Sequence, residues 1–126
     1  IFKEAMEAKE LFACMLLADQ SPSNHKNSFW MNFLNQGTPK LFGPEYLAKK
    51  YNVPIFYFEV LKVKRGFYEA TLVPVSYNPE TETYGDITFK HNKLLEDSIR
   101  KNPSQWLWSH KKWKHAKHAT DFEVRE

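Results

Sequence analysis

One short segment near the end of the chain combines residue types that bind amphiphilic anions. Residues 102–114 read Asn-Pro-Ser-Gln-Trp-Leu-Trp-Ser-His-Lys-Lys-Trp-Lys, which places three of the four tryptophans beside three lysines and a histidine. Aromatic rings and long cationic side chains suit a boundary between apolar and anionic groups, as in a lipid headgroup. A nucleic-acid groove offers a similar combination, since bases stack on aromatic rings. The segment by itself leaves both partners open.

The candidate binding residues of this segment are its aromatic and basic ones. They are Trp106, Trp108, His110, Lys111, Lys112, Trp113 and Lys114. Asn102 as a cap, Pro103 in the first turn and Gln105 in a capping box predict a helix here. At 100° per residue, Trp106 and Trp108 face different sides of that helix, which favours a segment wedged between the domain and a partner. The plainer interpretation is that the tryptophans are buried and the lysines solvated.

A second candidate lies after the apolar run Leu11–Ala18. This run has strand length and no polar alternation, which is typical of a strand buried on both faces of a parallel sheet. Asp19 and Gln20 follow it directly. Ligands of open parallel sheets gather at the carboxyl ends of the strands, so both residues are candidate site residues. Capping of a turn is the alternative role for Asp19.

The remaining chemistry-bearing residues predict neither a metal nor a nucleotide site. His110, His115 and His118 are surrounded by lysines, whose positive field disfavours a bound dication. His25 lies in a polar loop and is expected at the surface. The single cysteine, Cys14, is expected to be a buried inert thiol in a reducing compartment. Only four glycines occur, without phosphate-cradling spacing, so no cofactor is expected.

Composition bounds the class of protein. The 126 residues fit one domain, and 16% aromatic residues argue against a disordered chain. The net charge of +3 is local, because without Lys111, Lys112, Lys114 and Lys117 the chain sums to about −1. A nucleic-acid binder usually spreads its charge more widely. No apolar stretch is long enough to span a membrane.

Local signals predict an α/β fold, with a partial mixed or parallel sheet covered by helices. We expect a helix end at about residues 2–10, the strand 11–18 and an extended segment 28–33, followed by a loop with Gly37, Pro39 and Gly43. A helix 44–51, a hairpin of strands 53–64 and 67–77 turning at Arg65-Gly66, and a helix 86–101 capped by Asp86 precede the last helix.

Three blocks of the sequence together resemble one family. They are Ala18–Pro22, the block from Trp30 to Pro39 with Gly43 to Val60, and Leu94–Arg100 followed by Pro103–Lys114. In this combination the chain resembles the late lipid A biosynthesis acyltransferases, the lauroyl and myristoyl transferases of Gram-negative bacteria. The resemblance implies a glycerol-phosphate-acyltransferase-like fold. It also implies transfer of an acyl chain from acyl carrier protein, or from acyl-CoA, to a lipid hydroxyl at the cytoplasmic face of the inner membrane.

The resemblance implies a catalytic pair that we do not expect in this chain. The family uses a histidine and an acidic residue separated by four positions, with the histidine as general base. His25, His110 and His115 have no acidic residue there, His118 lies in a tail, and His91 reaches Glu96 only by coincidence along a predicted helix. Since the chain also starts without methionine, we expect residues 1–126 to be a soluble C-terminal portion of an acyltransferase domain. The catalytic half and the membrane anchor are expected to be absent, and the portion to be inactive alone.

The alternative function belongs to another class of protein. The chain would then be a non-catalytic module that binds anionic lipid or nucleic acid through the Trp/Lys segment. Steeply salt-dependent oligonucleotide binding would favour nucleic acid. The resemblance favours the lipid enzyme, with no nucleic-acid partner.

Overall fold

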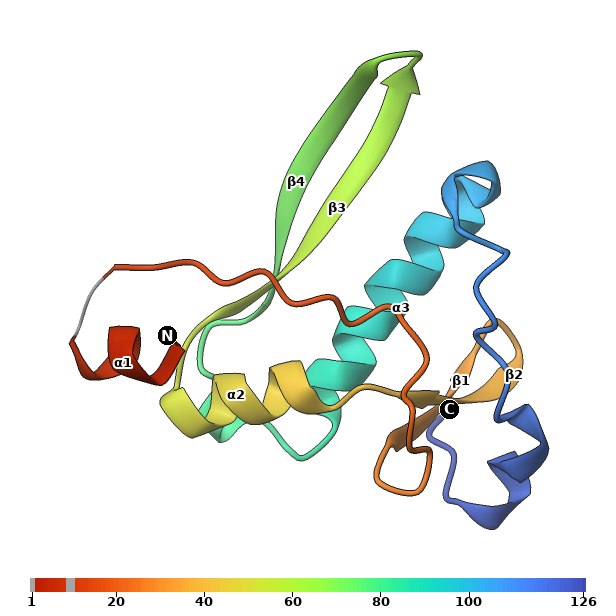
Figure 1. Ribbon diagram of the computed structural model, residues 1–126, viewed down its shortest axis with the longest axis horizontal. Helices are drawn as coiled ribbons and strands as arrows, with labels where there is room; N and C mark the ends of the chain where they lie inside the picture. Colours follow the sequence, from red (N-terminus) through yellow and green to blue (C-terminus); the bar gives the residue numbers. More distant parts are fainter. Residues whose placement is uncertain (1, 9–10) are drawn as a thin grey trace.

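Two antiparallel hairpins and one long helix organise the chain (Figure 1). The computed structural model describes residues 2–8 and 11–126. The main elements are α1 (Phe2–Glu7), β1 (Phe29–Phe33), β2 (Gln36–Lys40), α2 (Gly43–Tyr51), β3 (Ile55–Lys64), β4 (Phe67–Ser76) and α3 (Asp86–Lys101). Short 3-10 helices occur at η1 (Pro79–Thr81), η2 (Pro103–Gln105) and η3 (Ala116–Asp121). The fold is therefore mixed α/β, as the sequence predicts.

The first hairpin supports the core and is extended by the end of the chain. Leu34 and Asn35 both adopt positive φ, 50° and 63°, which closes a two-residue turn between β1 and β2. Arg125 pairs with the free edge of β1: its N–H donates to the carbonyl of Trp30 at 3.1 Å, and its carbonyl accepts from the N–H of Asn32 at 2.7 Å. The C-terminal tail thus adds a short parallel bridge beside β1.

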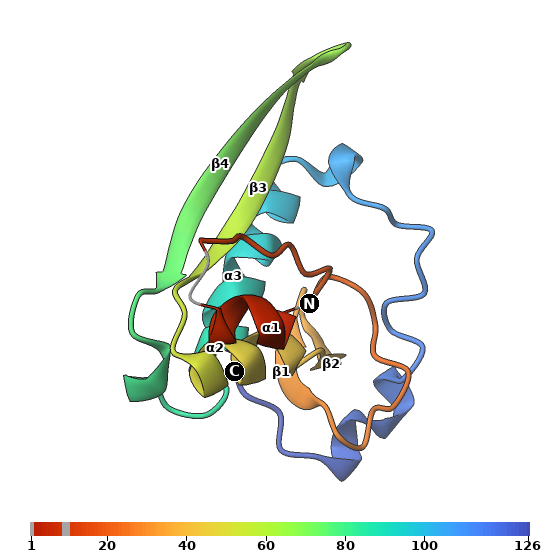
Figure 2. The same ribbon diagram turned by 60° about the vertical axis from the view of Figure 1, so that its left-hand side comes forward.

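The second hairpin projects away from the rest of the molecule (Figures 1 and 2). The ten-residue strands β3 and β4 form nine antiparallel residue pairs, and Gly66 at φ 80° makes the turn that the Arg65-Gly66 pair predicts. Near its base, Tyr57 and Val75 pack into the core, while the distal residues are exposed. This hairpin is therefore packed into the core at its base only.

The core lies between α3 and the bases of both hairpins. Its fully buried members are Phe33, Tyr57, Val75, Ile87, Leu95 and Ile99. Trp106 and Trp113 pack against this cluster as half-buried side chains. The apolar stripe of α3 supplies half of the cluster, as its 3.6-residue periodicity predicts.

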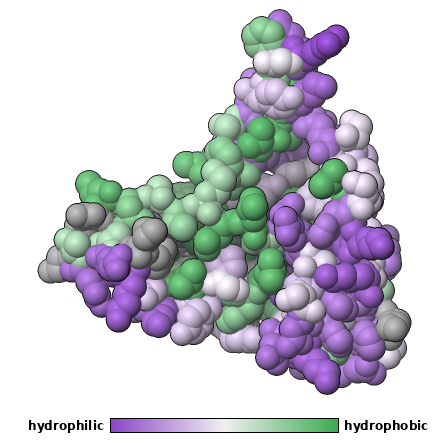
Figure 3. Space-filling model, viewed as in Figure 1, coloured by the Kyte–Doolittle hydropathy of each residue, from purple (hydrophilic) through white to green (hydrophobic). Residues whose placement is uncertain are grey.

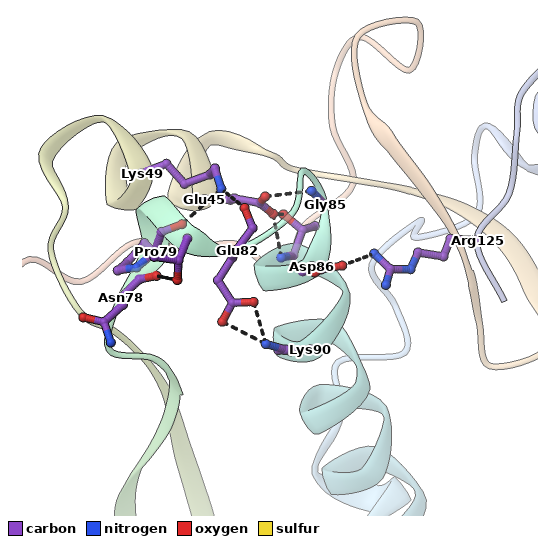
Figure 4. A network of polar contacts seen from close by, with 11 residues as sticks. Glu45, Lys49, Asn78, Pro79, Glu82, Gly85, Asp86, Lys90 and Arg125 are labelled. Carbon is purple, nitrogen blue, oxygen red and sulfur yellow. Dashed lines mark hydrogen bonds and ion pairs between the residues drawn. The ribbon is translucent and has the colours of Figure 1, made fainter.

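A polar network fixes the start of α3 (Figure 4). Glu45 from α2 is buried, and its carboxylate accepts from the N–H of Gly85 at 2.7 Å and from the N–H and hydroxyl of Thr88 at 2.8 and 2.6 Å. These N–H groups have no partner within the helix, so Glu45 caps it. Arg125 donates to Asp86 at 2.6 Å and ties the tail to the same helix end. The Asp86 carboxyl keeps a lowered pKa because of this bond.

Several predicted elements are confirmed. The helix 44–51 becomes α2, and Asn52 closes it in the left-handed region at φ 47°. The helix 86–101 becomes α3, although Gly85 and not Asp86 takes the cap position. The extended segment 28–33 becomes β1, and the long hairpin becomes β3 and β4. The helix end predicted for residues 2–10 is found as α1, while residues 9 and 10 lie outside the described part.

Four predictions are wrong. The run Leu11–Ala18 is extended but makes no ladder pairs, and most of its side chains, Cys14 included, are exposed. A buried strand depends on neighbouring strands at both edges, and among the strands described none pairs with it. Both sheets are antiparallel, so no parallel sheet forms in the described residues. The predicted loop at Gly37 and Pro39 is strand β2. The predicted last helix is absent, and only η2 and η3 interrupt an irregular path.

Candidate functional site

The structure brings the two predicted site segments together. Asp19 is half-buried and Gln20 is exposed, directly after the apolar run. The ammonium group of Lys112 donates to the backbone carbonyl of Asp19. The N–H of Ser21 donates to Nε2 of His110 at 3.1 Å. Residues about ninety positions apart in the sequence thus form one site.

Lys112 is an interior residue of this site. It is only 1% exposed, and burial lowers its pKa to about 8 while the Asp19 carboxylate opposes that shift. Its ammonium lies 5.8 Å from the ring centre of Phe33. Lys112 therefore joins the segment around Asp19 to the core. Lys111 and Lys114, on either side of it in the sequence, are exposed.

Lys40 at the end of β2 lies beside the same ring and was not predicted. It is 0% exposed, its Nζ lies 3.0 Å from the ring centre of Phe33, and no hydrogen-bond partner for Nζ is found in the described residues. Burial, reinforced by the charge of Lys112, holds its pKa well below the usual value. A cation–π contact is its main compensation. Lysine is rarely buried without a partner, so the sequence does not indicate that Lys40 lies in the interior.

The tryptophans occupy different environments, as predicted, but for a different reason. Trp113 donates its indole N–H to the hydroxyl of Thr38 at 3.0 Å and packs with Trp106 against the core. Trp108 is 53% exposed, and its indole N–H bonds to the carbonyl of Pro103 at 2.7 Å. An extended chain with turns, not opposite faces of a helix, separates the rings.

A group of stacked histidines lies beyond Lys112. The ring of His25 lies 4.7 Å from that of His115 and 4.4 Å from that of His118, between ring centres. Nε2 of His115 is 3.1 Å from the carbonyl of Pro22, and Nδ1 of His118 is 3.4 Å from the carboxylate of Asp121. Reduced solvation and the neighbouring imidazoles lower the pKa of His25. The ring of His25 stacks on that of His118 and lies tilted against that of His115, so the three rings hold the loop against the tail. His25 is half-buried in this group, whereas the sequence predicts a surface position.

The chain matches the family described as bacterial lipid A biosynthesis acyltransferase over residues 3–115. It belongs to this family. The matched range contains every candidate site residue from Asp19 to Lys114 and confirms the resemblance of the three sequence blocks. No curated protein matches the chain. Acyl transfer in lipid A biosynthesis is thus the family setting in which the site must be understood.

Two histidines have an acidic residue at the spacing of the family's expected catalytic pair. His91 precedes Glu96, and His118 precedes Glu123, a pair that the sequence analysis missed. The ring of His91 packs edge-on against Tyr57, at 5.3 Å between centres, and burial lowers its pKa to about 4. The Glu96 carboxylate instead accepts from the N–H of Leu34 and from Arg100. His118 pairs with Asp121, as described above, so neither histidine contacts the acid at that spacing.

Neither of two hollows found in the described residues is a deep pocket at this site. A depression of about 340 Å³ lies between β4 and α3, lined by residues such as Val75, Phe89 and Leu94, away from Asp19. A gap of about 10 Å³ beneath Ala18 has room for no more than a single water. Within residues 2–8 and 11–126 no histidine, cysteine and carboxylate group has metal-binding geometry. No helix in that part is both long and apolar enough to cross a bilayer.

Proposed function

We propose that this chain forms the substrate-binding part of an acyltransferase that acylates a lipid A-type lipid. In the reaction the acceptor hydroxyl oxygen bonds to the acyl carbon, the C–S bond of a thioester donor breaks, and the departing thiol takes up the proton. The donor is acyl carrier protein or acyl-CoA. We place the parent protein at the cytoplasmic face of the inner membrane, with no nucleic-acid partner and no cofactor.

The observation that carries this proposal is the contact between residues 19–21 and the Trp/Lys segment, residues 102–114. Lys112 and His110 hold the backbone of Asp19 and Ser21. Both parts of this contact lie in the range that matches the family. Contact between two segments far apart in the sequence is more informative than either segment alone, because each has a plainer structural role by itself.

The side chains divide into those that hold the site and those free to bind. Lys112 and Trp113 are positioning residues, since their polar atoms already bond to Asp19 and Thr38. Lys111 and Lys114 are exposed and are proposed to bind the phosphates of the acceptor. His110 accepts a backbone N–H through Nε2, which leaves that atom unable to act as a base. Gln20 is exposed at the rim and is proposed to contact acceptor or donor.

The test compares lipid A with its dephosphorylated form, each presented to the full chain in neutral detergent micelles. Lys111→Gln combined with Lys114→Gln is expected to weaken binding of lipid A by at least roughly tenfold, since charge-assisted hydrogen bonds contribute about 1.5–3 kcal/mol. Lys3→Gln combined with Lys50→Gln is the control, because both lysines are exposed elsewhere. Equal binding of both lipids, or equal loss in the control, would contradict the proposal. Tighter binding of an oligonucleotide than of lipid A would favour the nucleic-acid module instead.

We also propose that this chain alone does not catalyse acyl transfer. His91 is half-buried with a pKa of about 4, and the carboxylate nearest His118 is Asp121, three positions on, so neither histidine forms the expected pair with an acid five positions on. Incubation of the chain with acyl carrier protein thioester and lipid acceptor should give no product above the background without protein. Turnover above that background would overturn this part of the proposal.

A further inference from the structure

The tip of the long hairpin is an exposed surface that the proposed site does not use. From Val60 to Tyr68 the sequence contains three cations, Lys62, Lys64 and Arg65, and no acidic residue. The same stretch exposes large apolar and aromatic side chains: Val63 is 60% exposed, Phe67 59% and Tyr68 63%. Solvent-exposed apolar side chains in such a group mark a contact surface.

The strand register places each aromatic side chain of the tip beside a lysine, with one such pair on each face of the hairpin. Tyr68 lies opposite Lys62, and Phe67 lies opposite Lys64. Residues directly opposite each other in an antiparallel pair share a face. The ammonium of Lys64 lies 4.3 Å from the ring centre of Phe67. In the same view as Figure 1, hydrophobic and hydrophilic residues lie side by side at this end of the molecule (Figure 3).

A second exposed apolar segment is tied to the same end of the molecule. The side-chain amide of Gln105 pairs with the main chain of Lys62: the Lys62 N–H donates to Oε1 at 2.9 Å, and Nε2 donates to the Lys62 carbonyl at 3.3 Å. Leu107, 69% exposed, and the exposed Trp108 lie two and three positions after Gln105. These two hydrogen bonds place the segment after α3 beside the distal part of β3.

The chemistry of this end fits a bilayer better than other partners. Tryptophan and tyrosine favour the headgroup region, aliphatic side chains such as Val63 and Leu107 favour the acyl chains, and lysine reaches the phosphates. A second copy of the chain would oppose three like charges at the tip, which disfavours a symmetric contact. A nucleic-acid strand would contact the cations and the aromatic rings but would leave the aliphatic side chains exposed to water.

We propose that the hairpin tip, Lys62 to Tyr68, together with Leu107 and Trp108, is a contact surface for an anionic bilayer. The basic side chains meet the lipid phosphates, and the aromatic side chains enter the headgroup region. This surface is distinct from Asp19, Lys111 and Lys114, and its binding requires neither donor nor acceptor. The inference therefore stands or falls separately from the proposed acyl transfer.

The test is flotation of the full chain with vesicles that contain no lipid A. One set is phosphatidylcholine alone, and the other contains roughly one third phosphatidylglycerol. Binding to the anionic set is expected, with a loss of roughly fivefold for each tip cation removed, so Lys64→Gln with Arg65→Gln should weaken it by roughly 25-fold. The matched control, Lys3→Gln with Lys50→Gln, should bind like the parent chain.

A second variant separates the apolar contribution from the charge. Phe67→Ser keeps the three cations and should also weaken binding, while far-ultraviolet circular dichroism checks that the hairpin still forms. Phe67→Trp should report insertion, through quenching of its fluorescence by brominated lipids. Equal binding to both vesicle sets, or unchanged binding of the charge variant, would overturn the proposal. Loss of a dimer on Phe67→Ser without loss of vesicle binding would assign the surface to a second copy.

Discussion

Replacing the buried Lys40 with methionine should stabilise the protein. Its amine is 0% exposed, lacks a hydrogen-bond partner and has a strongly lowered pKa. Methionine keeps a similar chain length against Phe33 and removes the unsatisfied polar group, whose burial costs about 1–3 kcal/mol. Exchange of buried charges for apolar side chains of similar volume has stabilised proteins by about 1–4 kcal/mol. We therefore expect a gain of about 2 kcal/mol at pH 7, or roughly 6–10 °C in Tm.

The gain should depend on pH in one direction. The pKa of Lys40 is lower in the folded than in the unfolded state, so the unfolded chain binds more protons. The stability of the unsubstituted protein therefore rises as pH increases from the pKa of Lys40 in the folded state to its unfolded value near 10.5. The advantage of Lys40→Met should accordingly shrink as pH rises toward 10.5.

Urea unfolding, followed by tryptophan fluorescence at pH 7 and at pH 10, measures both effects. The difference between Lys40→Met and the unsubstituted protein cancels the titration of groups that do not interact with Lys40. Lys50→Met serves as the control because Lys50 is exposed on α2. A loss of stability in Lys40→Met, or a gain that stays constant up to pH 10, would refute the reasoning that an unpaired amine is buried there.

Two further predictions concern the anchors of the fold. Glu45→Gln should lower the free energy of unfolding by about 1–3 kcal/mol, because it weakens three hydrogen bonds at the start of α3. In urea unfolding, Glu80→Gln at an exposed position is the control and should change this free energy little. An equal effect of both substitutions would contradict the capping role of Glu45. Trp113→Phe should cost about 1–2 kcal/mol through the lost bond to Thr38 and lost packing. Trp108→Phe should cost less than Trp113→Phe in the same assay, since Trp108 is exposed; the reverse order would contradict the assigned environments.

Local sequence signals predicted those elements whose stability is local. Pro44 and Asn52 bound α2, and Gly66 permits the turn of the long hairpin. The face predicted for α3 contains Ile87 and Leu95, which are buried in the core, and Leu94, which packs against it. The strand β2 was missed because Gly37 and Pro39 normally interrupt strands. Proline is tolerated where a strand needs no donor at that position, and the ladder places Pro39 opposite Trp30.

Tertiary contacts decided the elements that were predicted wrongly. The segment after Asn102 has helix-start signals, but Lys112 and Trp113 make their polar contacts with Asp19 and Thr38 across the molecule, and the chain bends to allow this. In a helix, Lys111 and Lys114 would also lie on one face, three positions apart, and would repel each other. Sequence reasoning selected two segments that the structure brings into contact. It could not foresee that Lys112 would be a buried joint rather than a solvated charge, since that depends on contacts about ninety residues away.

The main-chain pairing of Arg125 with β1 has a consequence for self-association. Open strand edges recruit further strands from other molecules, which is the first step of β-aggregation. The tail occupies the edge of β1 beside Met31, and the amide of Gln105 occupies the edge of β3 at Lys62. The side chain of Gln105 covers much less of the β3 edge than the C-terminal tail covers of the β1 edge. The long hairpin is therefore the part of this chain through which molecules at high concentration would add strand to strand, whereas β1 is shielded for as long as its tail remains in place.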